Sequence, residues 1–251
     1  MRLYSVCHKE LRSEAVSRLT PDERRHVIGY IVNEDYPKLY FSELVDYVKE
    51  YELENYNPKY QRDSFSEYSV APHLYLNPQL AEGITHVGVL HSDIIMQEGC
   101  IDEMIEVFAT APETIFYDTL FRPPRKNTKA MEPPLWMTTM QAQFIADYVS
   151  ERLYPVNIER VYSQGWIGGM AVASKDVFTR FGEFLNKYSG DFERVLNETV
   201  LASHVWAKEF NACCFITERM WGFYLMSINH TIKQMNIIHD RDYKCYVNTI
   251  K

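Results

Sequence analysis

Apolar residues along the chain fall into short runs, separated by stretches in which they recur every three or four positions. Short apolar runs bounded by polar or turn residues predict buried strands. Strands are expected at Leu3–Cys7, Val27–Val32, Thr85–Leu90, Thr114–Asp118, Gly165–Ala173, Cys213–Thr217 and Met235–His239. The predicted strands are therefore spread from one end of the chain to the other.

The stretches between these runs carry the periodicity of amphipathic helices. Helices are expected after a capping Ser42, over Ile101–Phe108, over Phe144–Leu153, after a capping Ser174, and from Glu198 after a capping Asn197. Residues 66–77 are expected to be helical at their ends, although Pro72 interrupts them. Strands that alternate with helices predict one α/β domain whose mostly parallel central sheet is flanked by helices.

Composition and charge narrow the function classes. The 251 residues are 46% hydrophobic with a formal net charge of −8, which excludes general disorder and disfavours a broad face for nucleic acid. The opening residues MRLYSVCHKE lack the apolar core of a secretory signal, and no apolar run is long enough to cross a membrane. The five cysteines are scattered without a CxxC pair, so no disulfide framework is expected. We therefore expect a cytoplasmic protein that binds no nucleic acid and has no membrane span.

The segment HVGVLHSDIIMQEG, residues 86–99, places an imidazole and a carboxylate within an apolar run. His91, Ser92 and Asp93 directly follow the predicted strand Thr85–Leu90. In an open α/β sheet, ligands bind at the carboxyl ends of the strands, so these side chains are expected to face a cleft. Asp93 there can offer oxygen ligands to a hard divalent cation. The same aspartate can also simply turn the chain after the strand.

The order of several segments resembles that of GT-A glycosyltransferases, especially the small capsular-polysaccharide type and its relatives in large DNA viruses. The segments that carry this resemblance are LYSVCHKE, RDSFSEYSVAPHLYLN, HVGVLHSDIIM, SQGWIGGMAVASKDVF and LNETVLASHVW, and they span roughly residues 3–240. The resemblance implies a single GT-A-like, Rossmann-like domain over residues 1–251. Its donor-binding half would cover about residues 1–120 and its acceptor-binding half about residues 135–251.

For the donor side, the resemblance implies a Mn²⁺ or Mg²⁺ ion that bridges the two phosphates of a nucleotide-sugar and stabilises the leaving diphosphate. Asp93 and the late His239 are the implied metal ligands. The family's usual Asp-x-Asp motif is matched only by Asp93, because position 91 is histidine. The residues implied to bind the donor are Tyr4, Arg62, Asp63, Ser66, Glu67, His91 and Ser92. Tyr4 would stack on a uracil ring and Arg62 would reach a phosphate; the alternatives are a core tyrosine and a solvated arginine.

For the acceptor side, the segment GWIGG is the candidate contact. Gly168 and Gly169 would let a sugar approach the backbone closely. The indole of Trp166 would offer a flat apolar face to a pyranose. A tight turn beside a buried tryptophan explains the same residues, so both interpretations stay open.

An inverting sugar transfer needs a carboxylate that takes the proton of the acceptor hydroxyl as it attacks. Glu198 is the first candidate for this base, and Asp118 and Asp191 are the others. A glutamate at a helix N-terminus is also stabilised by the helix dipole without any catalytic role.

The implied function is a metal-dependent glycosyltransferase, a hexosyl- or pentosyltransferase that moves a sugar from a nucleotide-sugar to a carbohydrate acceptor in glycan assembly. A UDP-sugar is the first candidate donor. Two alternatives stay open: a non-catalytic nucleotide- or carbohydrate-binding module, which fits the histidine at position 91, and a metal-dependent phosphoesterase that uses His91, Asp93 and His239. The phosphoesterase lacks a further cluster of carboxylates and histidines for the usual two-metal arrangement.

Overall fold

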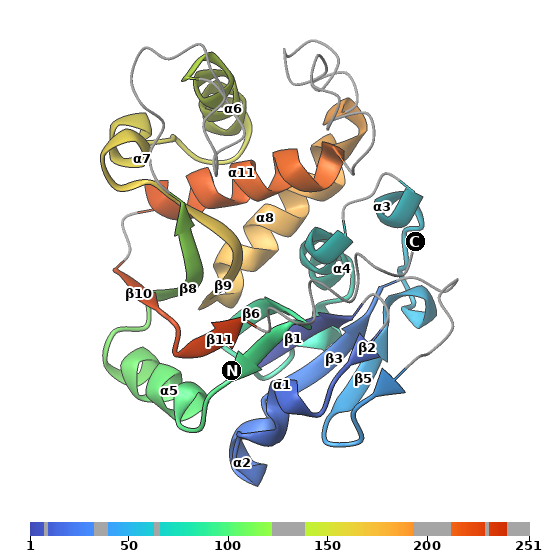
Figure 1. Cartoon of the computed structure of the whole chain (residues 1–251). Coiled ribbons are helices and arrows are strands. Elements are labelled where there is room, and N and C mark those ends of the chain that lie inside the picture. The colour runs from blue at the N-terminus through green and yellow to red at the C-terminus, as the bar shows by residue number, and fades with distance from the viewer. Residues whose placement is uncertain are drawn as a thin grey trace.

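The strands predicted near residues 3–7 and 85–90 lie side by side in the middle of a sheet (Figure 1). The computed structural model describes residues 1–7, 10–32, 40–62, 66–121, 139–192, 212–228 and 231–239. Within these residues the main sheet has seven strands, in the order β10-β8-β9-β6-β1-β3-β5. They are β10 (Ile232–Gln234), β8 (Ile115–Phe121), β9 (Trp166–Ser174), β6 (His86–His91), β1 (Arg2–Cys7), β3 (Val27–Ile31) and β5 (Asp46–Lys49).

Most neighbouring strands in this sheet are parallel. β1 pairs in parallel with β3 and β6, β3 pairs with β5, and β8 pairs with β10. β9 runs antiparallel between β6 and β8. β1, β6 and β9 are buried along almost their whole length, as expected for strands covered on both faces. The predicted mostly parallel mixed sheet is therefore confirmed.

Helices cover both faces of the sheet (Figure 1), and two strand pairs form separate small sheets. The helices are α1 (Glu14–Ser17), α2 (Pro21–Arg24), α3 (Lys59–Arg62), α4 (Val70–Leu76), α5 (Cys100–Thr110), α6 (Thr139–Arg152), α7 (Ile158–Gln164), α8 (Lys175–Tyr188) and α11 (Ala212–Ser227). The 3-10 turns are η1 (Glu50–Glu52), η2 (Ser66–Ser69), η3 (Pro78–Ala81) and η4 (Ser189–Asp191). β11 (Ile237–His239) pairs antiparallel with β7 (Ile94–Met96), and β2 (Glu10–Leu11) pairs in parallel with β4 (Tyr40–Phe41).

The packing of these helices joins the elements into a single α/β domain. α8 packs on α4 and β9, while α11 packs on β9 and on α6 and α7 (Figure 1). The apolar core is continuous from β1 to α11. None of the helices described is long and apolar enough to cross a bilayer.

The strand predicted at Cys213–Thr217 is wrong, because these residues belong to the helix α11. Nearly every described side chain of α11 is buried, so this helix is apolar all round rather than amphipathic. A short apolar run has no periodicity that distinguishes a buried helix from a buried strand. The error therefore comes from reading five residues of a sixteen-residue apolar helix.

The helix predicted after Ser42 is also wrong, because β5 occupies residues 46–49 at the edge of the sheet. The hydroxyl of Ser42 accepts a hydrogen bond from the Leu44 N–H at 3.2 Å, which shapes a turn rather than a helix cap. The side chains of β5 are half-buried or exposed, so its apolar residues carry only a weak pattern.

Two other local expectations come out differently. Residues 66–77 form η2 followed by α4, and the helix continues through Pro72. Pro72 lies in the first turn of α4, where the N–H groups have no partner within the helix. Ser174 precedes α8 as predicted, but its side chain makes no capping hydrogen bond. The predicted cap Asn197 lies outside the described residues.

Candidate active site

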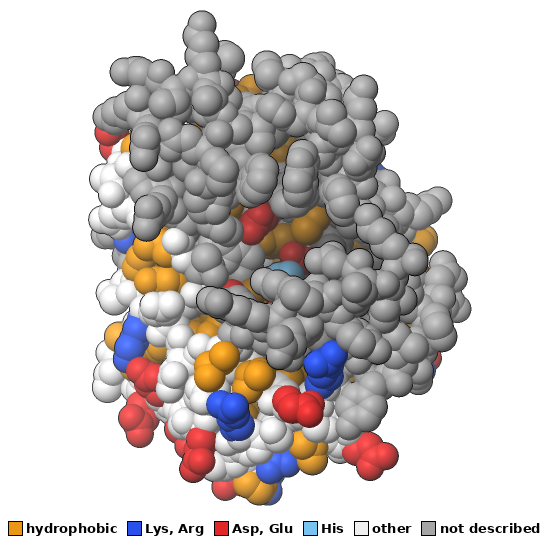
Figure 2. Space-filling model, in the orientation of Figure 1, with side chains coloured by type: hydrophobic (Ala, Val, Ile, Leu, Met, Phe, Trp, Pro, Cys, Tyr) orange, Lys and Arg blue, Asp and Glu red, His pale blue; other side chains and the backbone are white. Residues whose placement is uncertain are grey.

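Polar side chains from η2, β6 and α11 gather at the edge where the central strands of the main sheet end, beside the start of β9. β1, β3 and β6 end at this edge, and the antiparallel β9 begins there with Trp166, Gly168 and Gly169. η2 packs beside β6, and α11 packs on both β9 and η2. Near the middle of this face, Figure 2 shows a hollow in which a histidine and acidic side chains are visible. Open α/β sheets bind their ligands at this edge, which makes it the candidate active site.

Glu67 from η2 meets His91 at the end of β6. Oε1 of Glu67 lies 3.3 Å from Nε2 of His91. The thiol of Cys214 on α11 donates to the same oxygen at 3.6 Å. Glu67 is buried, whereas the His91 side chain is 39% exposed. The buried carboxylate therefore holds the imidazole, which is the more accessible of the two groups.

A β-bulge shapes the start of β9. Between Tyr117 and Thr119, two steps along β8 match three steps along β9, so β9 carries an extra residue. Gly169 lies in this interval with a φ of +40°, a conformation that L side chains rarely adopt. A Cβ at Gly169 would lie 3.6 Å from Nε2 of His91 and 3.9 Å from Oε1 of Glu218. Glycine here permits the bulge and brings the backbone of β9 close to His91 and Glu218.

Helix α11 brings Glu218 and Arg219 to the same place. Glu218 accepts a hydrogen bond from the backbone N–H of Gly169, and its Oε2 lies 3.3 Å from the Arg219 guanidinium. Arg219 is buried and lies over the ring of Trp166, 5.5 Å from the ring centroid. Gly222, one helical turn further on, lets α11 approach the backbone of β9 closely. Glu218 is therefore held in a fixed position against the bulge.

The protein environment raises the pKa of two acidic groups near Glu67, the Glu218 carboxyl and the Cys214 thiol. Burial raises the pKa of Glu218 above its ordinary value against the opposing effect of Arg219, and the neighbouring Glu67 adds to the increase. Burial also raises the pKa of Cys214. The thiol therefore stays protonated at neutral pH and serves as a hydrogen-bond donor to Glu67.

We expect His91 to remain protonated at neutral pH. Burial alone would lower the pKa of His91, but Glu67, Asp93 and Glu218 outweigh it and raise the pKa to about 9. The ion pair with Glu67 therefore stabilises the fold fully below about pH 6.5, the ordinary pKa of histidine, and is lost as the pH rises through about 9. An NMR titration of the imidazole signals of the metal-free protein measures this value.

His86 is the internal control for that titration, because burial lowers its pKa. Its signal should move below pH 6.5 while that of His91 moves well above it. Glu67→Gln should bring the pKa of His91 back toward 6.5 and leave His86 unchanged. A wild-type His91 that titrates at or below pH 6.5 would contradict the geometry of the pair.

Of the two implied metal ligands, Asp93 directly precedes β7 and His239 ends the neighbouring strand β11. β11 places His239 opposite Ile94 in the register, next to Asp93 along the chain. Asp93 itself is only 8% exposed, so it does not open freely into a cleft as expected. No three His, Cys, Asp or Glu side chains that the structure describes gather as a metal site. Carboxylate and imidazole suit Mn²⁺ or Mg²⁺ only if substrate phosphates complete the coordination, which is common for Mg²⁺.

Two predicted contact residues lie in the core, and the stacking roles expected for them do not fit. Tyr4 is fully buried in the middle of β1, donates its hydroxyl to the Leu80 carbonyl at 2.6 Å and packs edge-on against Tyr30. Trp166 is 1% exposed and packs edge-on against Phe223. Neither ring has a free face for a uracil or a pyranose. The core interpretations of both residues are therefore the better ones.

The structure gives the surroundings of only some of the other predicted site residues. Ser92 is buried next to His91 in the chain, and Asp118 is buried on β8 where the pairing with β9 is irregular. Asp191 is half-buried in η4, beside α3, and no contact described in the structure joins it to the cluster. Arg62 ends α3 and Ser66 begins η2, but their side chains lie outside the described residues, as do those of Asp63, Glu198 and His239.

Glu218 and Tyr68 are residues near Gly169 that the sequence interpretation misses, and only Glu218 carries a signal in the sequence. The segment ACCFITERMWGFYLMS contains a glutamate and an arginine within an otherwise apolar run. The same kind of interruption marks His91 and Asp93, and a buried charge needs partners. The signal was therefore available in the sequence, but the incorrect strand ended just before Glu218.

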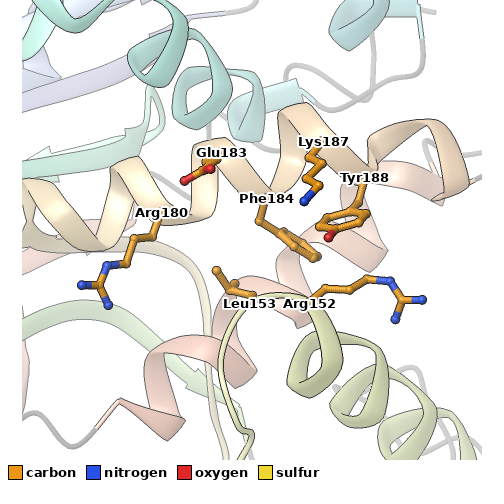
Figure 3. Close-up of a pocket in the computed structure, with 7 residues that line it drawn as sticks. All are labelled: Arg152, Leu153, Arg180, Glu183, Phe184, Lys187 and Tyr188. Carbon is orange, nitrogen blue, oxygen red and sulfur yellow. The ribbon is translucent and has the colours of Figure 1, made fainter.

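A second hollow, of about 180 Å³, lies between α6 and α8 (Figure 3). It is lined by Arg152, Leu153, Arg180, Glu183, Phe184, Lys187 and Tyr188. The guanidinium groups of Arg152 and Arg180 point away from one another (Figure 3). The guanidinium of Arg152 is paired with Glu151 at 2.7 Å. The positive charges around this hollow do not converge on one point, so we assign no ligand to it.

Comparisons with known proteins bear on the fold. No family model matches the sequence, and no curated protein matches it significantly. Among solved structures, the fold is similar to that of the bifunctional glycosyltransferase WbbM in its apo form, with a TM-score of 0.60 and 15% sequence identity. The similarity covers 96% of this chain, which spans 45% of the WbbM chain. The chain therefore has a fold that is found in a glycosyltransferase.

Proposed function

We propose that the chain is a GT-A glycosyltransferase that moves a sugar from a nucleotide-sugar to a carbohydrate acceptor in glycan assembly. The observation that carries the proposal is the cluster of Glu67, His91 and Glu218 around Gly169, at the carboxyl edge of the sheet. A carboxylate that orients an imidazole, beside a second carboxylate and an open glycine, suits a ligand rich in hydroxyl groups. The fold similarity supports the same reaction class without identifying the donor.

The cluster draws on both of the expected halves of the domain. Glu67 and His91 come from the half assigned to the donor, and Gly169 and Glu218 from the half assigned to the acceptor. In the proposed enzyme, the donor would bind over the end of β6 and the acceptor over the start of β9. Glu67 fixes the ring of His91, and Gly169 leaves room for a sugar to approach the backbone.

A divalent cation is part of this proposal. Asp93 and His239 would hold Mn²⁺ or Mg²⁺ together with the donor phosphates, and the ion would stabilise the charge that develops on the leaving diphosphate. A UDP-sugar remains the first candidate donor, by analogy with the family that the sequence resembles.

A thermal-shift screen of UDP- and GDP-sugars with and without Mn²⁺ tests the proposal. A donor present at about 100 times its Kd should stabilise the native state by about 2.7 kcal/mol, which raises Tm by roughly 5 to 10 °C for a chain of this size. Asp93→Ala should remove the Mn²⁺-dependent part of the rise. Release of UDP or GDP from the stabilising donor then measures turnover.

Asp102→Ala is the matched control, because Asp102 is an exposed aspartate on α5, away from the cluster. It should leave the metal-dependent shift unchanged. If no nucleotide-sugar raises Tm, the proposed function is wrong. Binding without turnover would favour a non-catalytic module, and hydrolysis of a simple phosphate ester without sugar transfer would favour a phosphoesterase.

A further inference from the structure

Three polar atoms lie around the position that a Cβ at residue 169 would occupy. A Cβ at this position would lie 3.5 Å from the Tyr68 hydroxyl, 3.6 Å from Nε2 of His91 and 3.9 Å from Oε1 of Glu218. These atoms come from η2, β6 and α11, so three elements converge on one point. A sugar hydroxyl that approaches Gly169 would therefore meet a hydroxyl, an imidazole and a carboxylate.

The hydroxyl of Tyr68 points to a ligand at this place. Tyr68 is 6% exposed, and its hydroxyl has no hydrogen-bond partner among the residues that the structure describes. A buried hydroxyl without a partner costs free energy, so such groups usually meet water or a ligand. The hydroxyl lies beside the open space at Gly169, where a ligand oxygen would satisfy it.

The carboxylates of Glu67 and Glu218 differ in how many hydrogen bonds and ion pairs they already make. Glu67 already accepts from Cys214 and is paired with His91. Glu218 is held by the Gly169 amide and Arg219, and 19% of its side chain remains exposed. Burial also raises the pKa of Glu218, which brings it closer to neutral pH, where a general base is most effective.

We propose that Glu218 is the general base of the sugar transfer and that the Tyr68 hydroxyl holds the same acceptor oxygen. This inference rests on the proposed function. As the acceptor oxygen forms its bond to the anomeric carbon, its proton passes to the Glu218 carboxylate. The bond from the anomeric carbon to the phosphate oxygen breaks, and its electron pair leaves with the nucleoside diphosphate.

Glu218→Gln tests the assignment, because glutamine keeps an oxygen for the Gly169 amide but cannot take a proton. The probes are UDP-glucose and UDP-galactose with a panel of p-nitrophenyl glycosides as acceptors, and the donor that raises Tm in the wild type is used. Turnover should fall at least about 100-fold, the usual lower limit for losing a general base. The donor Kd should stay within about threefold, since the acceptor proton plays no part in donor binding.

Three further variants sharpen the result. Glu218→Asp should recover part of the lost turnover, because it keeps a carboxylate. Tyr68→Phe should lower turnover about tenfold, mainly through a higher KM for the acceptor. Glu183→Gln, an exposed glutamate of α8 in the second hollow, should change neither quantity.

The possible outcomes separate this inference from the proposed function. A wild type that neither binds nor turns over any donor defeats the proposed function. A wild type that is active, with a Glu218→Gln variant within about threefold of it, overturns the base assignment alone. Loss of donor binding together with turnover in Glu218→Gln also overturns it. If Glu198→Gln abolishes turnover while Glu218→Gln does not, the base is Glu198.

Discussion

Alanine at position 222 is expected to lower the free energy of unfolding by about 2 kcal/mol. The added Cβ would lie 2.2 Å from the carbonyl oxygen of Ile167 and 2.7 Å from the indole of Trp166. Overpacking of this kind costs up to about 3 kcal/mol, because a backbone oxygen cannot move aside as a side chain can. Alanine regains about 1 kcal/mol through its higher helix propensity, which is too little to reverse the sign. Urea unfolding of wild type and variant measures the difference.

Gly190→Ala is the matched control. Among the residues that the structure describes, the Cβ added there would meet only the Nζ of Lys59, at 3.3 Å, and this atom is the far end of a flexible side chain. We expect a change below about 1 kcal/mol at Gly190. Equal stability of Gly222→Ala and wild type would show that α11 does not depend on close contact with β9.

Gly222→Ala should also disturb the position of Glu218 beside Gly169. Gly222 and Glu218 are four residues apart on α11, so they share the face that contacts β9. A helix displaced from β9 at Gly222 also moves Glu218 away from the Gly169 amide. The glycine therefore serves the position of the carboxylate as well as the packing of the core.

The central strands could be predicted from the sequence because burial on both faces makes them apolar throughout. β1, β3 and β6 agree with the predicted runs to within a residue or two. α11 and β5 could not, since the first is apolar all round and the second lies half-exposed at an edge. A short apolar run is read as a buried strand, which is right for β1, β3 and β6 and wrong for α11. Periodicity separates a helix from a strand only when one face is buried and the other is not.

The site could be predicted in part for a related reason. A polar residue at the end of an apolar strand marks the edge of the sheet, and His91 lies at that edge beside Glu67. The partners that meet there are 24 to 151 positions apart in the chain, as with Glu67 and Glu218, and no spacing rule joins them. Tyr4 and Trp166 show the reverse error, because an aromatic ring in an apolar segment is most often part of the core.

A buried polar network behind η2 holds the turn that carries Glu67. Glu50 and His73 are fully buried. Glu50 accepts a hydrogen bond from the Ser69 hydroxyl at 2.8 Å, and its Oε2 lies 3.4 Å from Nδ1 of His73. Nε2 of His73 accepts from the Asn57 N–H at 3.3 Å, which leaves the ring proton on Nδ1, where the Tyr30 hydroxyl lies 3.1 Å away and Glu50 slightly further. The carboxylate of Glu50 therefore ties Ser69, the last residue of η2, to α4.

Glu50→Ala is expected to lower the free energy of unfolding by about 2 kcal/mol, because it leaves the buried Ser69 hydroxyl without its acceptor and removes the carboxylate beside His73. Glu50→Gln keeps one oxygen as an acceptor and should lose less than half as much. Urea unfolding measures both values, and Glu183→Ala, at an exposed site, should change stability by less than about 0.5 kcal/mol. A loss at Glu50 no larger than that at Glu183 would mean that η2 is held by its apolar contacts alone. In that case the position of Glu67 would not depend on the network behind it.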